Sequence, residues 1–173
     1  MAITERCLLI NLGAGDFAVP LRQLLSIEPM ARVVPVPRVP SWILGVTYRE
    51  GRVLPVVDLG VMLSEGVGPD PERTVARLLI AVVGDVAVAL AVPAATEVFT
   101  VSAEHIAPVP PLPDRTVNRY LTGNVTYGEQ SFGMLDLGRL MHSPEFLLIG
   151  SRDQGYLEQP LRPTSPKEPG DTP

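Results

Sequence analysis

The 173-residue sequence has one cysteine, Cys7, and two histidines, His105 and His142. A single cysteine excludes an intramolecular disulfide, and we interpret Cys7, which lies in an alternating apolar segment, as a small buried hydrophobic residue. Neither histidine has a cysteine nearby or a partner at ligand spacing, so the sequence predicts no metal site. No glycine-rich phosphate loop opens a helix, and no serine has the spacing of a nucleophile elbow. The chain therefore shows almost no catalytic chemistry, and we expect no cofactor.

Basic residues are also scarce. The chain has 14 Lys and Arg against 19 Asp and Glu, and a net charge of −5. Nucleic-acid phosphates require a basic face, so this balance argues against nucleic acid as a partner. The longest apolar stretch, residues 78–92, is interrupted by Gly84 and Asp85 and is too short to span a bilayer. With no export signal at the N-terminus, we expect a cytoplasmic protein without direct membrane insertion.

The sequence does contain an internal repeat. Residues 42–63 read WILGVTYREGRVLPVVDLGVML, and residues 120–141 read YLTGNVTYGEQSFGMLDLGRLM. Both blocks carry a glycine, a turn signal, a short apolar run and then Asp-Leu-Gly. Three pairs are each 78 residues apart: Gly45 and Gly123, Asp58 and Asp136, and Gly60 and Gly138. Two copies suggest two similar subdomains with a surface between them.

The short apolar runs predict β-hairpins. Residues 78–83 and 86–92 flank Gly84-Asp85, a two-residue turn of the kind that favours type I′ or II′ geometry. Residues 7–12 and 17–19 form the matching hairpin of the first half. The repeated blocks add hairpins that turn at residues 50–51 and 128–129. We therefore predict an all-β fold with short helical turns, among them one at residues 102–106 that Ser102 caps, and a C-terminal helix near residues 143–149.

Nineteen prolines help to set the domain boundaries. Proline donates no hydrogen bond to a β-ladder, so its clusters mark connectors rather than central strands. We predict one ordered domain over residues 1–150, with halves at roughly 7–63 and 78–141 joined by a loop at 64–74. Residues 151–173 are rich in proline and lack an apolar pattern, and we expect them to form a disordered tail.

Several segments together resemble one family. Residues 45–59 read GVTYREGRVLPVVDL, close to a signature of the form Gly-Val-x-Asn-Leu-Arg-Gly-x-x-x-Pro-Val-Val-Asp-Leu. Residues 98–106 and 120–123 follow in the order and spacing of the same family. Over roughly residues 5–150 the chain resembles the CheW-like coupling proteins of bacterial chemotaxis. One short motif is weak evidence, but several in order make a specific match.

The resemblance implies two intertwined, five-stranded, SH3-like β-barrels with a hydrophobic groove between them. Proteins of this family have no enzymatic activity. They are scaffolds that connect the cytoplasmic tip of a methyl-accepting chemoreceptor to the regulatory domain of a CheA-type histidine kinase. The resemblance thus implies a cytoplasmic adaptor, and receptor arrays at the inner face of the membrane are one expected location.

The chain departs from the family at its partner surface. Where the family usually has Asn-Leu-Arg, residues 48–50 are Tyr-Arg-Glu, so alignment places Glu50 at a partner-contacting arginine. Ser26 stands where the family usually carries glutamate. Like charges at an interface can cost several kcal/mol, so we expect a divergent surface matched to its own partner. By alignment, the residues expected to contact partners are Leu24, Ser26, Ile27, Gly45, Val46, Tyr48 and Glu50.

Other interpretations stay open at this point. Glu50 can be simply a solvated hairpin residue. The protein can be an adaptor of the same fold that has lost the kinase and binds another regulator. A remote alternative is an aspartyl hydrolase that uses Asp58 and Asp136 as a facing pair. In that family a hydroxyl residue lies between Asp and Gly, and here Leu59 and Leu137 stand there, so we expect each aspartate to cap the short helix that follows it.

Overall fold

The computed structural model describes residues 3–13, 15–64, 74–110 and 116–147. These residues are mostly β-strand with a few short helical turns, which confirms the predicted all-β fold. The predicted tail at 151–173 and most of the predicted loop at 64–74 lie outside the described residues. The elements are β1 (Thr4–Asn11), β2 (Asp16–Pro20), η1 (Leu21–Gln23), β3 (Leu24–Pro29), β4 (Ile43–Arg49), β5 (Arg52–Asp58), α1 (Leu59–Leu63), β6 (Arg77–Val83), β7 (Val86–Val92), β8 (Ala94–Ser102), η2 (Ala103–His105), β9 (Ile106–Ala107), η3 (Thr116–Tyr120), β10 (Leu121–Tyr127), β11 (Gln130–Leu135) and α2 (Leu137–Met141).

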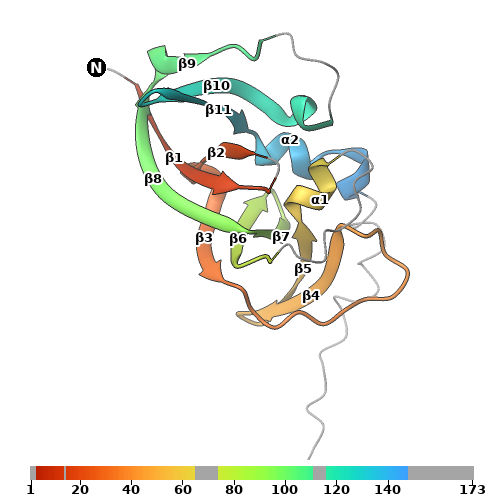
Figure 1. Cartoon of the computed structure of the whole chain (residues 1–173). Coiled ribbons are helices and arrows are strands. Elements are labelled where there is room, and N and C mark those ends of the chain that lie inside the picture. The colour runs from red at the N-terminus through yellow and green to blue at the C-terminus, as the bar shows by residue number, and fades with distance from the viewer. Residues whose placement is uncertain (1–2, 14, 65–73, 111–115, 148–173) are drawn as a thin grey trace, which may run out of the picture.

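The described strands form two sheets, and each sheet mixes strands from both halves of the chain (Figure 1). One sheet has the order β8-β1-β2-β11-β10-β9, and the other has the order β3-β6-β7-β5-β4. The β1–β2 hairpin of the first half therefore joins strands of the second half, and the β6–β7 hairpin joins strands of the first half. In both sheets the exchanged hairpin is attached through a parallel pair, β2 with β11 and β7 with β5. The two subdomains are intertwined in this sense.

The repeat seen in the sequence is repeated in backbone contacts. The β4–β5 ladder has an irregularity between Ile43 and Gly45, and the β10–β11 ladder has one between Leu121 and Gly123. The amide of Asp58 donates to the carbonyl of Trp42 at 2.7 Å, and the amide of Asp136 donates to the carbonyl of Tyr120 at 2.8 Å. Each of these pairs follows the 78-residue offset. The repeated block is thus a structural unit, a bulged hairpin followed by a short helix.

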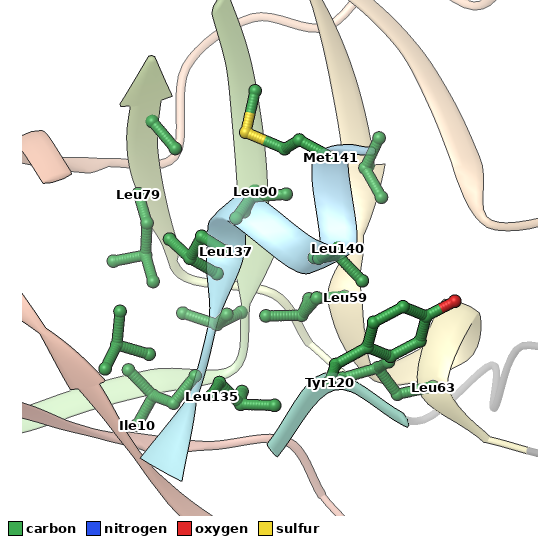
Figure 2. Close-up of a cluster of buried hydrophobic side chains, with 14 of the residues drawn as sticks. Ile10, Leu59, Leu63, Leu79, Leu90, Tyr120, Leu135, Leu137, Leu140 and Met141 are labelled. Carbon is green, nitrogen blue, oxygen red and sulfur yellow. The ribbon is translucent and has the colours of Figure 1, made fainter. Parts of the chain in front are cut away.

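The main hydrophobic core joins both sheets and both α-helices (Figure 2). Ile10 comes from one sheet, Leu79 and Leu90 come from the other, and Leu59 and Leu137 come from the two helices. Two smaller clusters, one around Phe99 and Phe132 and one around Leu54 and Ile80, lie on the other faces of the sheets. Both sheets are therefore buried on two faces, which fits the near-continuous apolar runs of their central strands.

The short helices agree with the sequence only in part. A helical turn does follow Ser102, but it is a 3₁₀ turn without a side-chain capping bond, so the predicted Ser102 cap was wrong. The amide of Ala103, at the start of this turn, donates instead to the backbone carbonyl of Ile3 at 2.8 Å. Residues 144–147 are helical, and the rest of the predicted C-terminal helix lies outside the described residues. The ring centroids of Phe146, in this turn, and Trp42 are 6.1 Å apart, and Trp42 also packs against the main core.

Candidate partner-binding surface

The β4–β5 hairpin presents two side chains to solvent. Arg49 pairs with Arg52, which leaves Glu50 and Gly51 as a two-residue turn. Both have positive φ, 48° and 80°, the requirement of a type I′ turn. Tyr48 is 67% exposed, and the Glu50 side chain is 74% exposed. The turn therefore offers an aromatic ring and a carboxylate, and the ladder from Gly45 to Arg49 contains no bulge that would bring Arg49 to the same face as Tyr48.

Strand β3 alternates between half-buried and exposed residues. Leu24, Ser26 and Glu28 are half-buried, whereas Leu25 and Ile27 are exposed by 64% and 39%. The register on β6 shifts between Leu24 and Ser26, so Leu25 is the bulged residue. Alignment to the family did not select Leu25, and its period-2 relation to Ile27 is the signal that could have found it.

A polar cluster joins β3 to β4, although these strands lie at opposite ends of the sheet order. Arg49 Nε donates to Glu28 Oε1 at 2.7 Å, and its Nη2 also contacts that oxygen. Nη2 lies 3.3 Å from Ser26 Oγ, and Ser26 Oγ donates to Glu28 Oε1 at 2.8 Å. We call these three residues, Ser26, Glu28 and Arg49, the seam. Hydrogen bonds from Arg49, which have the larger effect, and from Ser26 hold the pKa of the Glu28 carboxyl below its ordinary value.

Val46 and Thr47 of β4 form hydrogen bonds with backbone atoms of the segment that precedes this strand. Val46 exchanges hydrogen bonds with Val34 at 2.8 and 2.9 Å, and Thr47 Oγ1 donates to the carbonyl of Arg32 at 2.9 Å. Gly45 allows this approach, since a Cβ there would lie 2.1 Å from the Val34 oxygen. In the described part of the chain these contacts end at Thr47. Tyr48 and Arg49 are held by the β5 ladder, and Arg49 also by the seam.

The seven residues expected to contact partners have different environments. Ile27, Tyr48 and Glu50 are exposed. Ser26 belongs to the seam, and Leu24 packs against the main core. Gly45 and Val46 contact the segment around Val34. The exposed residues can touch a partner directly, and the others make contacts within the protein. Which of the seven residues bind a partner stays a prediction.

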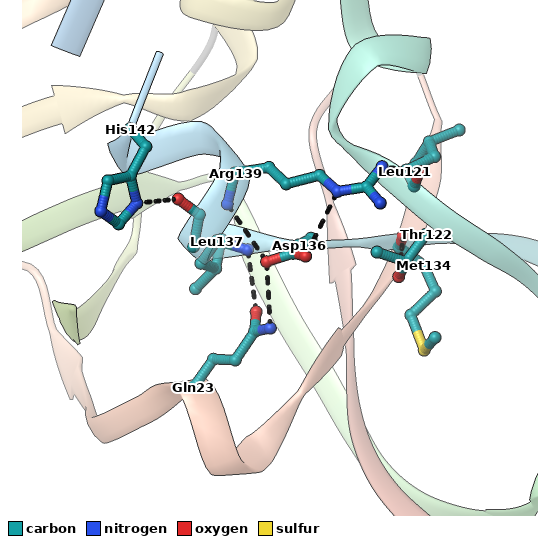
Figure 3. Close-up of polar contacts among 9 residues, drawn as sticks. Gln23, Leu121, Thr122, Met134, Asp136, Leu137, Arg139 and His142 are labelled. Atoms are coloured by element: carbon teal, nitrogen blue, oxygen red, sulfur yellow. Dashed lines mark hydrogen bonds and ion pairs between the residues drawn. The ribbon is translucent and has the colours of Figure 1, made fainter.

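The two repeated aspartates are helix caps. Asp58 Oδ1 accepts from the amide of Val61 at 3.0 Å, and Asp136 Oδ1 accepts from the amide of Arg139 at 3.2 Å. Figure 3 shows that Gln23 reaches across from η1 and brackets the start of α2, accepting from Leu137 N at 2.8 Å and donating to Asp136 Oδ1 at 3.3 Å. The predicted capping role is confirmed. Across the described residues, no group of three or more His, Cys, Asp or Glu side chains could hold a metal ion.

The sequence and the fold match a known family. The model of the CheW-like domain matches residues 6–145. The chain belongs to the CheW-like family. It is 28% identical to the chemotaxis protein CheW of Klebsiella aerogenes over 148 residues, covering 85% of this chain and 87% of that protein. It is 30% identical to the protein FrzA of Myxococcus xanthus over 135 residues, 77% of this chain and 82% of that protein.

A solved structure supports the fold. The scaffolding protein TtCheW from Thermoanaerobacter tengcongensis matches with a TM-score of 0.71 at 18% identity, over 83% of this chain and 96% of that one. Family membership makes the chain a non-enzymatic chemotaxis adaptor. This overturns the aspartyl hydrolase alternative, whose two aspartates are occupied as caps of separate helices. Among the described residues no helix is long and apolar enough to cross a membrane.

Proposed function

We propose that this CheW-like adaptor couples the cytoplasmic tip of a methyl-accepting chemoreceptor to the regulatory domain of a CheA-type histidine kinase. We place it in the cytoplasm, at receptor arrays on the inner face of the membrane. The family match over residues 6–145 supports an adaptor. The observation that carries the kinase contact is the exposed pair Tyr48 and Glu50 on the β4–β5 turn. Arg49, between them, contacts Ser26 and Glu28 of β3, the strand that exposes Leu25 and Ile27.

The chemistry of this surface suits a specific but transient contact. Aromatic residues are enriched at interface cores, where a rigid ring buries a large area at low entropic cost. Glu50 adds a negative charge where the family usually has a positive one. An interface charge sets partner choice and association rate more than raw affinity. We therefore propose that the partner carries a basic side chain opposite Glu50.

Isothermal titration calorimetry tests this function. The protein is titrated with the regulatory domain of the CheA-type kinase encoded nearest its gene, as wild type and as Glu50→Arg. We expect binding by the wild type and at least about tenfold weaker binding by Glu50→Arg, because the change sets two basic side chains against each other. Glu129→Arg is the matched control. Glu129 is exposed on the equivalent two-residue turn of the β10–β11 hairpin, so this change alters net charge equally.

Two results would contradict the proposal in different ways. Binding that is unaffected by Glu50→Arg would make Glu50 a solvated turn residue and remove the matched-charge surface. Absence of wild-type binding would favour the second candidate function, an adaptor of the same fold that has lost the kinase and binds another regulator. The altered residues at 26 and 48–50 are the observation that keeps this candidate in view. Binding restored by Glu50→Arg would point strongly to it.

A further inference from the structure

The residue between the two exposed turn side chains points the other way. Arg49 lies between Tyr48 and Glu50, yet its side chain is only 21% exposed and reaches across to β3. There it contacts Glu28 through Nε and Nη2 and Ser26 through Nη2. The two contacts with Glu28, from Nε and Nη2 of one planar guanidinium, fix the orientation of the Arg49 side chain as well as its distance from Glu28. The same side chain lies 3.4 Å from Glu50 Oε2, so the seam also reaches the exposed carboxylate.

The turn needs such support. Glu50 holds φ at 48°, a region that residues other than glycine, asparagine and aspartate rarely adopt. Strands β3 and β4 share no backbone ladder among the described residues, since they lie at the two ends of the sheet order. Among the described residues, the hydrogen bonds of β4 with the Arg32–Val34 segment end with the Thr47 hydroxyl. In that part of the chain, the hydrogen bonds and the ion pair of the Arg49 side chain therefore link the end of β4 to strand β3.

The second half of the molecule closes the equivalent place differently. Tyr127, 78 residues after Arg49, ends strand β10 and stacks on Phe99 of β8 with ring centroids 4.5 Å apart. Strands β8 and β10 hold the places in their sheet that β3 and β4 hold in the other. Each half of the molecule thus joins the two strands at these equivalent places by a side-chain pair. The pair is the aromatic stack of Tyr127 and Phe99 in one half and the ion pair of Arg49 and Glu28 in the other.

We infer that Arg49 and Glu28 are positioning residues that hold the β4–β5 turn so that Tyr48 and Glu50 face the partner. The pair lies at positions 28 and 49, whereas the family usually carries a glutamate and an arginine where Ser26 and Glu50 stand in this chain. In this chain the basic side chain is used within the protein, and an acidic one is left outside for the partner. This inference rests on the proposed function, because it assigns the pair a role in presenting the partner surface.

Two readouts test the inference. The first is amide hydrogen exchange over residues 48–52 in the free protein, where we expect Arg49→Gln and Glu28→Gln each to exchange about fivefold faster, the scale of one lost ion pair. The second is the Kd for the kinase regulatory domain, which we expect to rise about fivefold in each variant. The double Gln variant should be no worse than either single one, because both singles remove the same interaction. Arg49→Lys keeps the charge without the planar two-contact geometry and should give intermediate values.

Glu5→Gln is the control for losing a surface ion pair. Glu5 lies 3.0 Å from Arg22 and outside the seam, so this variant should leave both readouts unchanged. Thermal unfolding of every variant shows that each is folded at the temperature of the assay. Faster exchange with an unchanged Kd would overturn the role in partner binding, and unchanged exchange would overturn the positioning role. Absence of wild-type binding would instead contradict the proposed function, while the exchange data would still judge the positioning of the turn.

Discussion

A Cβ atom placed on Gly45 would lie 2.1 Å from the backbone oxygen of Val34. Gly45 also has φ at 142°, a conformation that side chains disfavour, and it sits at the bulge of the β4–β5 ladder. Val34 and Val46 exchange two backbone hydrogen bonds beside it. The missing side chain is thus what lets the chain before β4 pair with the edge of the sheet.

We expect Gly45→Ala to lower the free energy of unfolding by about 3 kcal/mol or more, because the clash is with backbone and the φ is strained. Gly123→Ala is the matched control in the other half. A Cβ there would meet Ile106 Cγ2 at 2.9 Å and the Ala107 oxygen at 3.1 Å, so smaller shifts relieve it, and we expect about 1 kcal/mol. Urea unfolding of both variants measures the difference. Equal losses would show that the Val34 contact is not special.

The repeat made much of the fold predictable. The 78-residue offset predicted the two repeated hairpins and the two aspartate caps, because these depend on residues close together in the chain, whereas the bulge in each hairpin was not predicted. The exchange of hairpins between the sheets came only from the resemblance, since it depends on packing between distant strands. The seam was not foreseen. Glu28 and Arg49 are 21 residues apart, and only the curling of the sheet brings its end strands together.

The strained turn residue makes a stability prediction. Glu50→Asn should raise the free energy of unfolding by about 0.5–1 kcal/mol, because asparagine tolerates positive φ and Asn-Gly is a preferred type I′ pair. The lost contact with Arg49 costs little, since the Glu50 carboxylate is well exposed. Glu129→Asn is the control, because in that turn Gly128 takes the positive φ of 62°. Chemical unfolding that shows equal effects of the two changes would contradict the strain at Glu50.

The caps of α2 should behave as one unit. We expect Asp136→Ala to cost about 1 kcal/mol through loss of the bond to the Arg139 amide. Gln23→Ala should cost a similar amount, because it leaves the Leu137 amide without its partner. Since Gln23 also donates to Asp136, the double variant should lose less than the sum of the two. Asp58→Ala, in the other helix, should add independently to Gln23→Ala, and a double-mutant cycle by urea unfolding checks both pairs.

The seam should weaken in acid. Hydrogen bonds from Arg49 and Ser26 lower the pKa of Glu28 in the folded protein, so the folded state binds this proton less tightly than the unfolded state. The stabilising contribution of Glu28 is therefore present above the unfolded pKa of 4.5 and is lost as the pH falls through the lower folded value. The difference in stability between wild type and Glu28→Gln should shrink below about pH 4.5. A difference that stays constant from pH 7 to pH 3 would contradict a seam held by the ionised carboxylate.

The lone thiol should respond to alkali. Cys7 is fully buried, and this burial, with the nearby negative charge of Glu5, raises the pKa of its thiol from 9.0 to about 11, against the opposing effect of Arg22. The folded state holds this proton more tightly than the unfolded state, so the contribution to stability is present below pH 9 and is lost as the pH rises toward 11. We expect wild type to lose about 2–3 kcal/mol more than Cys7→Ala over this range. At pH 8 a disulfide reagent should label Cys7 only as fast as the protein opens, because the thiolate is the reactive form. Rapid labelling of the native protein would show that the thiol is accessible without opening.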